Sequence, residues 1–241
     1  MTHPGTDLTS LPLPPEARDA LKKPREERIH AHAIRVPAAW WNAALTERTL
    51  PGGPIGGETK GDGYTTITRS RLFSLASEAE SDEEILGLLW HVLAWGSGSK
   101  LRHNHRRLVA ISRQRQDATN ALRTAAHLAR NDPEAAYARL TSAGGTRPLL
   151  KYLGPSFFTK YLYFAGAGAS DHPCAILDSR VAITLRKRCG WASLYGTGHW
   201  PAKTYERYCG LLSRWAKTES DHVQREVCPD EIERWLFDTR P

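Results

Sequence analysis

The sequence predicts a mainly α-helical protein with a small irregular and β-containing N-terminal portion. Apolar residues recur at intervals of three and four in several segments, which is typical of amphipathic helices. Helix-start signals precede some of these segments, as in Ser81-Asp82-Glu83-Glu84, where a glutamate follows a serine three residues later. By contrast, the stretch from Tyr64 to Thr68 alternates as a short strand does.

The N-terminal part begins with 27 residues that are rich in proline and charge. We expect residues 1–27 to form a flexible arm and residues 28–241 to form one domain. Proline suits the first turn of a helix, so a helix is predicted to start near Pro37. The segment 51–63 holds six glycines and two prolines and is expected to be an irregular loop. After the short strand, a helix is predicted from about Leu72.

Helices account for most of the remaining chain. A buried amphipathic helix is predicted at 82–95, because Ile85, Leu89 and Val92 fall on one face. Glycine and proline at positions 154 and 155 interrupt a helical segment, so a helix–turn–helix arrangement is expected there. In chain order, the other predicted helices cover about 108–130, 133–140, 157–164, 179–189, a segment from about 201, and 229–237.

Length and composition exclude several classes of protein. A chain of 241 residues can bury a substantial core, as one compact domain or as two fused subdomains. Its mean hydropathy is −0.49, and no apolar run approaches the roughly 20 residues needed to cross a bilayer. The N-terminal residues lack the basic and apolar pattern of a signal peptide, so we expect a cytoplasmic protein that does not associate with membranes.

The cysteines and histidines do not indicate a metal site. The four cysteines lie 15, 20 and 19 residues apart, so neither a zinc ribbon nor a compact four-cysteine iron–sulfur loop is predicted. His30-Ala31-His32 and His103-Asn104-His105 have no cysteine or acidic partner at ligand spacing. Exposed or DNA-facing histidines are therefore the favoured interpretation, and we expect no metal and no cofactor.

The positive charge is concentrated in one segment. The formal net charge is +7, and residues 100–130 alone carry eight basic residues against Asp117. Such a local positive field favours binding of polyanions, including nucleic acid. A solvated basic helix is the alternative. The basic residues are Lys100, Arg102, Arg106, Arg107, Arg113, Arg115, Arg123 and Arg130.

The most informative segment is 149–181, LLKYLGPSFFTKYLYFAGAGASDHPCAILDSRV. Lys160 is the one lysine in the apolar run from Phe157 to Phe164, and Asp178 follows it by 18 residues at the head of a predicted helix. This pattern resembles the catalytic segment of the helix-hairpin-helix DNA glycosylases, particularly their 8-oxoguanine branch. The run from Gly154 to Lys160 lacks the usual two-glycine hairpin and looks nearer to the archaeal members. The resemblance implies a two-lobed fold with this segment at the junction.

The resemblance implies catalytic roles for two residues. In this family a lysine at the position of Lys160 attacks the sugar, and an aspartate at the position of Asp178 assists. A carboxylate beside C1′ stabilises the positive charge that develops there, and apolar neighbours favour the neutral amine that attack requires. Simpler alternatives exist: Asp178 could serve as a helix cap, and Lys160 could extend from an apolar helix to solvent.

Further residues are candidates for contact with DNA. Backbone N–H groups of the hairpin could bind a phosphate at the helix N-terminus. The loop from Trp95 to Asn104 combines glycines with basic groups, and Asn104 or His103 is a candidate wedge that fills the gap left by a flipped base. The predicted DNA-binding residues are Gly154, Ser156, Lys100, Arg102, Asn104, Arg106, Arg107 and Arg180. The predicted base pocket comprises Phe157, His199, Trp200 and Trp41.

These observations lead us to expect a DNA glycosylase that acts as a monomer on a modified base in double-stranded DNA. The sequence leaves the substrate open: an oxidised guanine in repair, or a bulky phage base such as glucosylated hydroxymethylcytosine in antiviral defence. An associated lyase activity at the abasic site is also left open. The alternative is a non-catalytic helix-hairpin-helix DNA-binding module, which would need neither Lys160 nor Asp178.

Overall fold

The computed structural model describes residues 7–56, 61–143, 145 and 147–239, and within these the fold is mainly helical. The prediction of a mainly α fold is confirmed. The elements are α1 Ala17–Leu21, the π-helical turn η1 Glu26–His30, β1 Ala33–Val36, α2 Ala38–Glu47, β2 Thr65–Thr68, α3 Arg69–Ser77, α4 Asp82–Ser97, α5 Asn104–Arg113, α6 Arg115–Leu128, α7 Pro133–Arg139, α8 Pro155–Phe164, α9 Ser179–Arg188, α10 Ala202–Val223 and α11 Pro229–Asp238.

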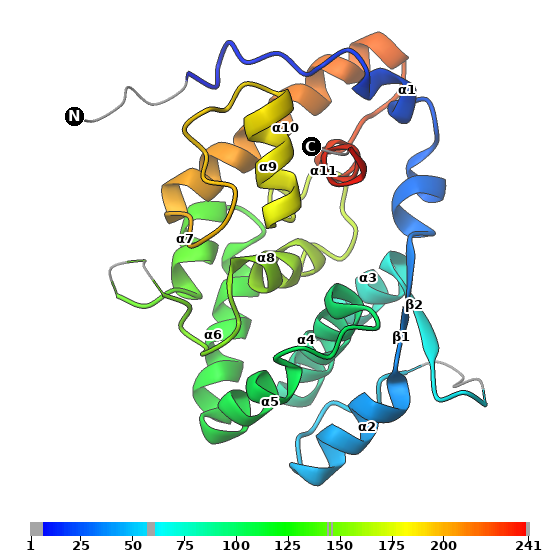
Figure 1. Ribbon diagram of the computed structural model, residues 1–241, viewed down its shortest axis with the longest axis vertical. Coiled ribbons are helices and arrows are strands. Elements are labelled where there is room, and N and C mark those ends of the chain that lie inside the picture. Colours follow the sequence, from blue (N-terminus) through cyan, green and yellow to red (C-terminus); the bar gives the residue numbers. More distant parts are fainter. Residues whose placement is uncertain (1–6, 57–60, 144, 146, 240–241) are drawn as a thin grey trace.

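Helix α8 crosses the middle of the molecule (Figure 1). Helices α9, α10 and α11 lie on one side of it together with α1, and α3, α4 and α5 lie on the other. Helix α4 is buried along its whole course from Ile85 to Trp95, which makes it the centre of that second group. Helix α8, Pro155–Phe164, therefore lies between two helical layers.

A two-stranded antiparallel sheet joins the N-terminal segment to α3. Strand β1 pairs with the predicted strand β2, with Ala33 opposite Thr68 and Val36 opposite Thr65. Strand β1 was not predicted from the sequence, because Ala33-Ile34-Arg35-Val36 does not alternate apolar and polar residues. The sheet brings the residues around His32 to the start of α3, where Thr68 caps the helix through the N–H of Arg71.

Most of the predicted helices are present, and one prediction was wrong. The predicted capping box forms, with Ser81 accepting from the N–H of Glu84. The region 108–130 is two helices, since the backbone of Gln114 leaves the helical conformation. The helix expected before Gly154 does not form; residues 149–150 are bends and residues 151–152 form a turn. The reason is local: Thr141 and Pro148 form an isolated bridge, and the chain reverses again at Tyr152.

The N-terminal segment packs on the C-terminal helices. Of the arm expected at 1–27, residues 1–6 lie outside the described residues, as do residues 57–60 of the glycine-rich loop. Leu8, Ala17 and Leu21 are buried. Arg18 forms an ion pair with Glu219 of α10 at 2.9 Å. These contacts fasten residues 7–27 to α10.

Two further features concern the chemistry of the chain as a whole. Cys174, Cys189, Cys209 and Cys228 are free and buried. No helix among the described residues is both long and apolar enough to cross a bilayer.

Candidate active site

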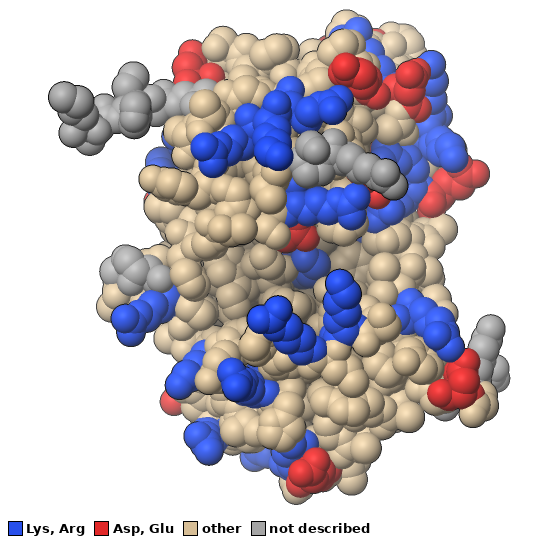
Figure 2. Space-filling model, viewed as in Figure 1, with Lys and Arg blue, Asp and Glu red and all other residues tan. Residues whose placement is uncertain are grey.

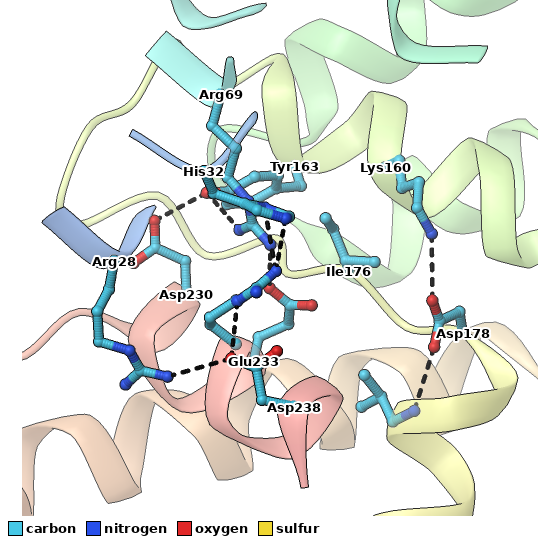
Figure 3. Close-up of polar contacts among 12 residues, drawn as sticks. Arg28, His32, Arg69, Lys160, Tyr163, Ile176, Asp178, Asp230, Glu233 and Asp238 are labelled. Atoms are coloured by element: carbon cyan, nitrogen blue, oxygen red, sulfur yellow. Dashed lines mark hydrogen bonds and ion pairs between the residues drawn. The ribbon is translucent and has the colours of Figure 1, made fainter. Parts of the chain in front are cut away.

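Lys160 and Asp178 meet at the junction between the two helical layers (Figure 3). The Nζ of Lys160 lies 3.3 Å from Oδ2 of Asp178 and donates to the carbonyl oxygen of Ser156 at 2.9 Å. The Lys160 side chain is 9% exposed and the Asp178 side chain 13%. Residues 18 positions apart in the chain thus form one nearly buried ion pair, at a distance that permits concerted chemistry.

Asp178 is a helix cap and a partner of Lys160 at the same time. Its Oδ1 accepts hydrogen bonds from the N–H groups of Arg180 and Val181, at 3.0 and 3.1 Å, and so caps α9. Its other oxygen, Oδ2, is the one that faces Lys160. Capping and a catalytic role therefore do not compete for the same atom, and the cap fixes the direction of the second oxygen.

The extended segment before Asp178 is anchored at three consecutive residues. Tyr205 donates to the carbonyl of Ala175 at 2.8 Å, and Tyr208 donates to that of Ile176 at 2.6 Å. The hydroxyl of Thr159, which precedes Lys160 in α8, accepts from the N–H of Leu177 at 3.2 Å. Hydrogen bonds from two helices thus fix the backbone that leads into Asp178.

A cavity of about 480 Å³ opens beside the pair. Lys160 and Asp178 lie on one side of it, and Trp95 and Gly96 at the end of α4 lie on another. A Cβ on Gly96 would lie 3.0 Å from the Lys160 Cδ and 3.3 Å from the Phe157 ring, so a larger residue there would make the Lys160 side chain shift by a few tenths of an ångström. The lining residues are His32, Ile34, Arg35, Arg69, Trp95, Gly96, Ser97, Gly98, Ser99, Lys100, Lys160, Ile176, Asp178, Glu233, Arg234 and Phe237.

One wall of the cavity is a buried polar network (Figure 3). Arg69 is 1% exposed, pairs with Glu233 of α11 at 3.0 Å and donates to the hydroxyl of Tyr163 at 3.1 Å. That hydroxyl donates to Asp230 at 2.9 Å, and Asp230 pairs with Arg25 at 2.8 Å. The network links the N-terminal segment, α3, α8 and α11, and fixes Glu233 at the cavity surface.

Burial determines the electrostatics of this wall. Burial raises the pKa of Glu233 from its ordinary value, although the nearby Arg69 opposes the change. Burial, together with the positive charges of Arg69 and Arg234, lowers the pKa of His32 to about 3. His32 is therefore neutral at neutral pH. The wall offers a carboxyl group and an uncharged imidazole, with Arg234 close to the imidazole at 2.7 Å.

Two predicted DNA contacts need correction. Asn104 is fully buried, where it bonds Ser97 and Arg107, so it cannot serve as a wedge. Arg107 is buried as well: its Nε donates to the carbonyl of Tyr152 at 2.9 Å and its guanidinium stacks 3.8 Å from the ring centre of Phe157. Burial lowers the pKa of Arg107 to about 10. Both residues therefore stabilise the interior through hydrogen bonds, Asn104 to Ser97 and Arg107 to the carbonyl of Tyr152.

The other predicted DNA contacts remain available to a ligand. Lys100, Arg102, Arg106 and Arg180 are exposed, and Lys100 also borders the cavity. Lys and Arg side chains lie on both sides of a hollow in the middle of one face (Figure 2). The phosphate contact at Gly154 and Ser156 stays a prediction; the Ser156 carbonyl itself is used by Lys160.

None of the four residues predicted for the base pocket lines the cavity described above. Phe157 lies nearest to the site, with its ring centre 6.0 Å from the Lys160 Nζ. Trp41 is fully buried in α2 against Trp40, Trp200 is buried and donates to the Tyr195 carbonyl, and His199 is exposed.

Trp95, Arg69, Glu233 and His32 line the cavity instead. The signals that could have identified them were weak. Trp95 precedes the sequence Gly-Ser-Gly, and Glu233 is an acidic residue on the buried side of an amphipathic helix.

Comparison with known proteins adds one finding. A family model described as "Putative 8-oxoguanine DNA glycosylase OGG-like protein" matches residues 27–237. The match runs from η1 into α11 and includes Lys160, Asp178 and the residues that line the cavity. No curated protein and no solved structure shows a significant match to the chain.

Proposed function

The chain belongs to the family of putative 8-oxoguanine DNA glycosylase OGG-like proteins, and from this membership we propose that it excises a modified base from double-stranded DNA, acting as a monomer. The observation that carries the proposal is the contact of 3.3 Å between Lys160 and Asp178 at the edge of a cavity of about 480 Å³. A nucleotide extruded from the duplex would place its base in the cavity and its sugar beside this pair.

The reaction breaks the bond between C1′ and the base nitrogen. The amine of Lys160 forms a bond to C1′ as the base departs with the bonding electrons, and the proton that the nitrogen loses balances the one that the base takes up. The carboxylate of Asp178 stabilises the positive charge that develops on the sugar. The C1′–O4′ bond of the sugar then breaks: O4′ leaves with the bonding electrons and takes up a proton from solvent, and the nitrogen lone pair forms an iminium with C1′. This ring-opened iminium either hydrolyses to an abasic site or proceeds to strand cleavage, which is the associated lyase activity.

The cavity wall favours oxidised guanine as the base. Guanine has no hydrogen on N7, whereas 8-oxoguanine carries an N7–H donor. The Glu233 carboxyl group in the wall can accept from such a donor. The ion pair between the Arg69 guanidinium and Oε2 of Glu233, 3.0 Å long, fixes the orientation of that carboxyl group. Guanine has no N7–H to donate and would turn its N7 lone pair toward this carboxyl group, so it would lack the hydrogen bond that 8-oxoguanine makes, which is a source of discrimination.

A second candidate substrate is a bulky modified base in phage DNA, such as glucosylated hydroxymethylcytosine. The volume of about 480 Å³ lies within the range of roughly 300–1,000 Å³ that is typical of small-molecule sites, so it has room for a base larger than guanine. Arg35, Lys100 and Arg234 on its border could donate to sugar hydroxyls. Under this alternative the protein would act in antiviral defence.

The non-catalytic alternative is less favoured. A module that only binds DNA needs exposed cations, but it needs neither a nearly buried lysine–aspartate pair nor an adjacent cavity. Burial of the charged pair lowers stability, because the charges lose their hydration. DNA binding alone gives no reason to retain such a pair. A catalytic role explains the pair and the cavity together.

Base release from defined duplexes tests the proposal. The full-length protein is incubated with duplexes that carry 8-oxoguanine, glucosylated hydroxymethylcytosine or only ordinary bases, and abasic sites are revealed by alkali. We expect release from one modified duplex and none from the ordinary one. Asp178→Asn is the matched control, since asparagine also caps a helix. Release from neither modified duplex would refute the proposal for these substrates.

A further inference from the structure

Tyr152 has a backbone conformation that aromatic residues rarely adopt. It occupies the third position of the turn Leu150–Leu153, in which the Leu153 N–H donates to the Leu150 carbonyl at 3.0 Å. Its φ is +69°, in the left-handed region, where turns favour glycine. Steric conflict with Cβ makes this conformation unfavourable for a bulky residue, so a tyrosine at this position invites a functional explanation.

The ring of Tyr152 does not offset this cost by packing in the core. Tyr152 is 38% exposed, one of three large hydrophobic residues that are exposed in the described part of the chain. Cations surround its ring: the Arg106 guanidinium lies 5.8 Å and the Lys151 ammonium 5.5 Å from the ring centre. An exposed aromatic ring between cations is the combination that proteins use to stack on bases while they contact phosphates.

A buried arginine holds Tyr152 next to the candidate active site. Arg107 donates through Nε to the Tyr152 carbonyl at 2.9 Å and stacks on Phe157 at 3.8 Å. The ring centre of Phe157 in turn lies 6.0 Å from the Lys160 Nζ. Through these contacts the strained turn is fixed relative to the residue that would attack the sugar.

We propose that Tyr152 inserts its ring into the base stack at the place that the extruded nucleotide vacates, and that Arg107 holds its backbone in position for this. The inference rests on the proposed function, because it concerns how the substrate base is kept out of the duplex. Removal of a base from the stack leaves its neighbours without a partner, and an inserted ring restores that contact. Arg106 and Lys151 then bind the flanking phosphates.

Tyr152 fits this role better than the wedge candidates chosen from the sequence. Asn104 is buried. His103 is exposed and also left-handed, with φ of +66°, but its Nε2 accepts from Arg102 at 3.0 Å and its ring offers less apolar surface for stacking.

The test compares variants of the full chain on two substrates. One is a duplex with the modified base, and the other is a bubble in which that base and its neighbours are unpaired. Tyr152→Gly removes the ring and relieves the backbone strain, Tyr152→Asn does the same with a side chain that tolerates the left-handed region, and Tyr152→Phe keeps the ring. Tyr195→Gly is the matched control, because Tyr195 is 75% exposed in a loop away from the cavity lining.

We expect Tyr152→Gly and Tyr152→Asn to slow excision from the duplex on the order of tenfold, as for loss of one stacking aromatic. Excision from the bubble should change less than about twofold, since little stacking is left to replace there. Tyr152→Phe and Tyr195→Gly should resemble the wild type on both.

Three outcomes would overturn the inference. They are duplex excision by Tyr152→Gly at the wild-type rate, an equal loss on duplex and bubble, and a loss in Tyr152→Phe as large as that in Tyr152→Gly. A purely structural turn residue predicts the first, because glycine suits the turn. If the wild type excises no base from either substrate, the proposed function fails instead, and the two failures are thus distinguishable.

Discussion

Thr159→Val tests whether the anchored segment before Asp178 controls catalysis. Thr159 is fully buried, and its hydroxyl donates to the Pro155 carbonyl at 2.7 Å and accepts from the Leu177 N–H at 3.2 Å. Valine has nearly the same shape but no hydroxyl. The substitution therefore leaves the Leu177 N–H buried and unpaired, and we expect the free energy of unfolding to fall by roughly 1–3 kcal/mol.

The effect on catalysis should exceed the effect on stability. Leu177 is adjacent to Asp178, and a displacement of about 1 Å of a reacting group can cost on the order of a hundredfold in rate. We therefore expect single-turnover excision by Thr159→Val to slow by about 10- to 100-fold at saturating enzyme, with DNA affinity little changed. Thr159→Ser, which restores the hydroxyl, should recover most of the rate.

A second buried threonine provides the control. Thr119 of α6 is 1% exposed, donates to the Arg115 carbonyl at 2.9 Å and does not line the cavity. Thr119→Val should lower stability and leave the rate of the folded enzyme unchanged. Chemical denaturation gives the stability of each variant, and quenched single-turnover assays give the rate. If Thr159→Val lost stability but excised the base as fast as Thr119→Val, the anchoring argument would be refuted.

The remaining predictions concern the reacting pair, the charged surface and the cavity wall. Asp178→Asn should slow excision by on the order of 10²-fold or more while DNA binding stays within several-fold, because the cap survives and the charge does not. Borohydride should trap a protein–DNA adduct that Lys160→Gln cannot form; excision by the wild type without trapping would mean that water attacks. Arg106→Glu should weaken binding to any DNA sequence and reduce the salt dependence, measured as the slope of log affinity against log salt, whereas an unchanged slope would exclude this residue from the interface. The pKa of His32 is lowered from 6.5 to about 3 in the folded protein, so the unfolded chain binds the proton more tightly, and stability should fall as pH drops from about 6.5 toward 3. In thermal melts His32→Asn should show a shallower fall than the wild type, and an identical pH profile would contradict this assignment.

The contact between Lys160 and Asp178 could be anticipated from the sequence because both residues have local signals. A lysine within an apolar run and an aspartate before a helix are visible without knowledge of the fold, and the resemblance of this segment to a known family connected them. Capping obeys the same local rules, which is why Ser81 and Asp178 were identified correctly as helix starts. These features depend on a few neighbouring residues.

The cavity could not be predicted, because it is assembled from distant parts of the chain. His32, Arg69, Trp95 and Glu233 come from four separate segments that meet only after folding. The same limit explains the errors at Asn104 and Arg107. Both are polar residues in a basic segment, yet tertiary packing turns them inward to bond each other. Sequence reveals that a side chain is charged, but its burial depends on partners elsewhere in the chain.

The ion pair between Arg25 and Asp230 has a consequence for the boundaries of the functional unit. The family match starts at residue 27, two positions after Arg25. A protein trimmed to that boundary would keep every residue that lines the cavity and yet lose the partner of Asp230, whose side chain is 5% exposed. Loss of one member of a buried pair costs roughly 3–5 kcal/mol. Asp230 also accepts from Tyr163, which bonds Arg69, so the damage would reach Glu233. A fragment that begins at residue 27 should therefore be less stable than the full chain, although it contains the whole region that defines membership of the family.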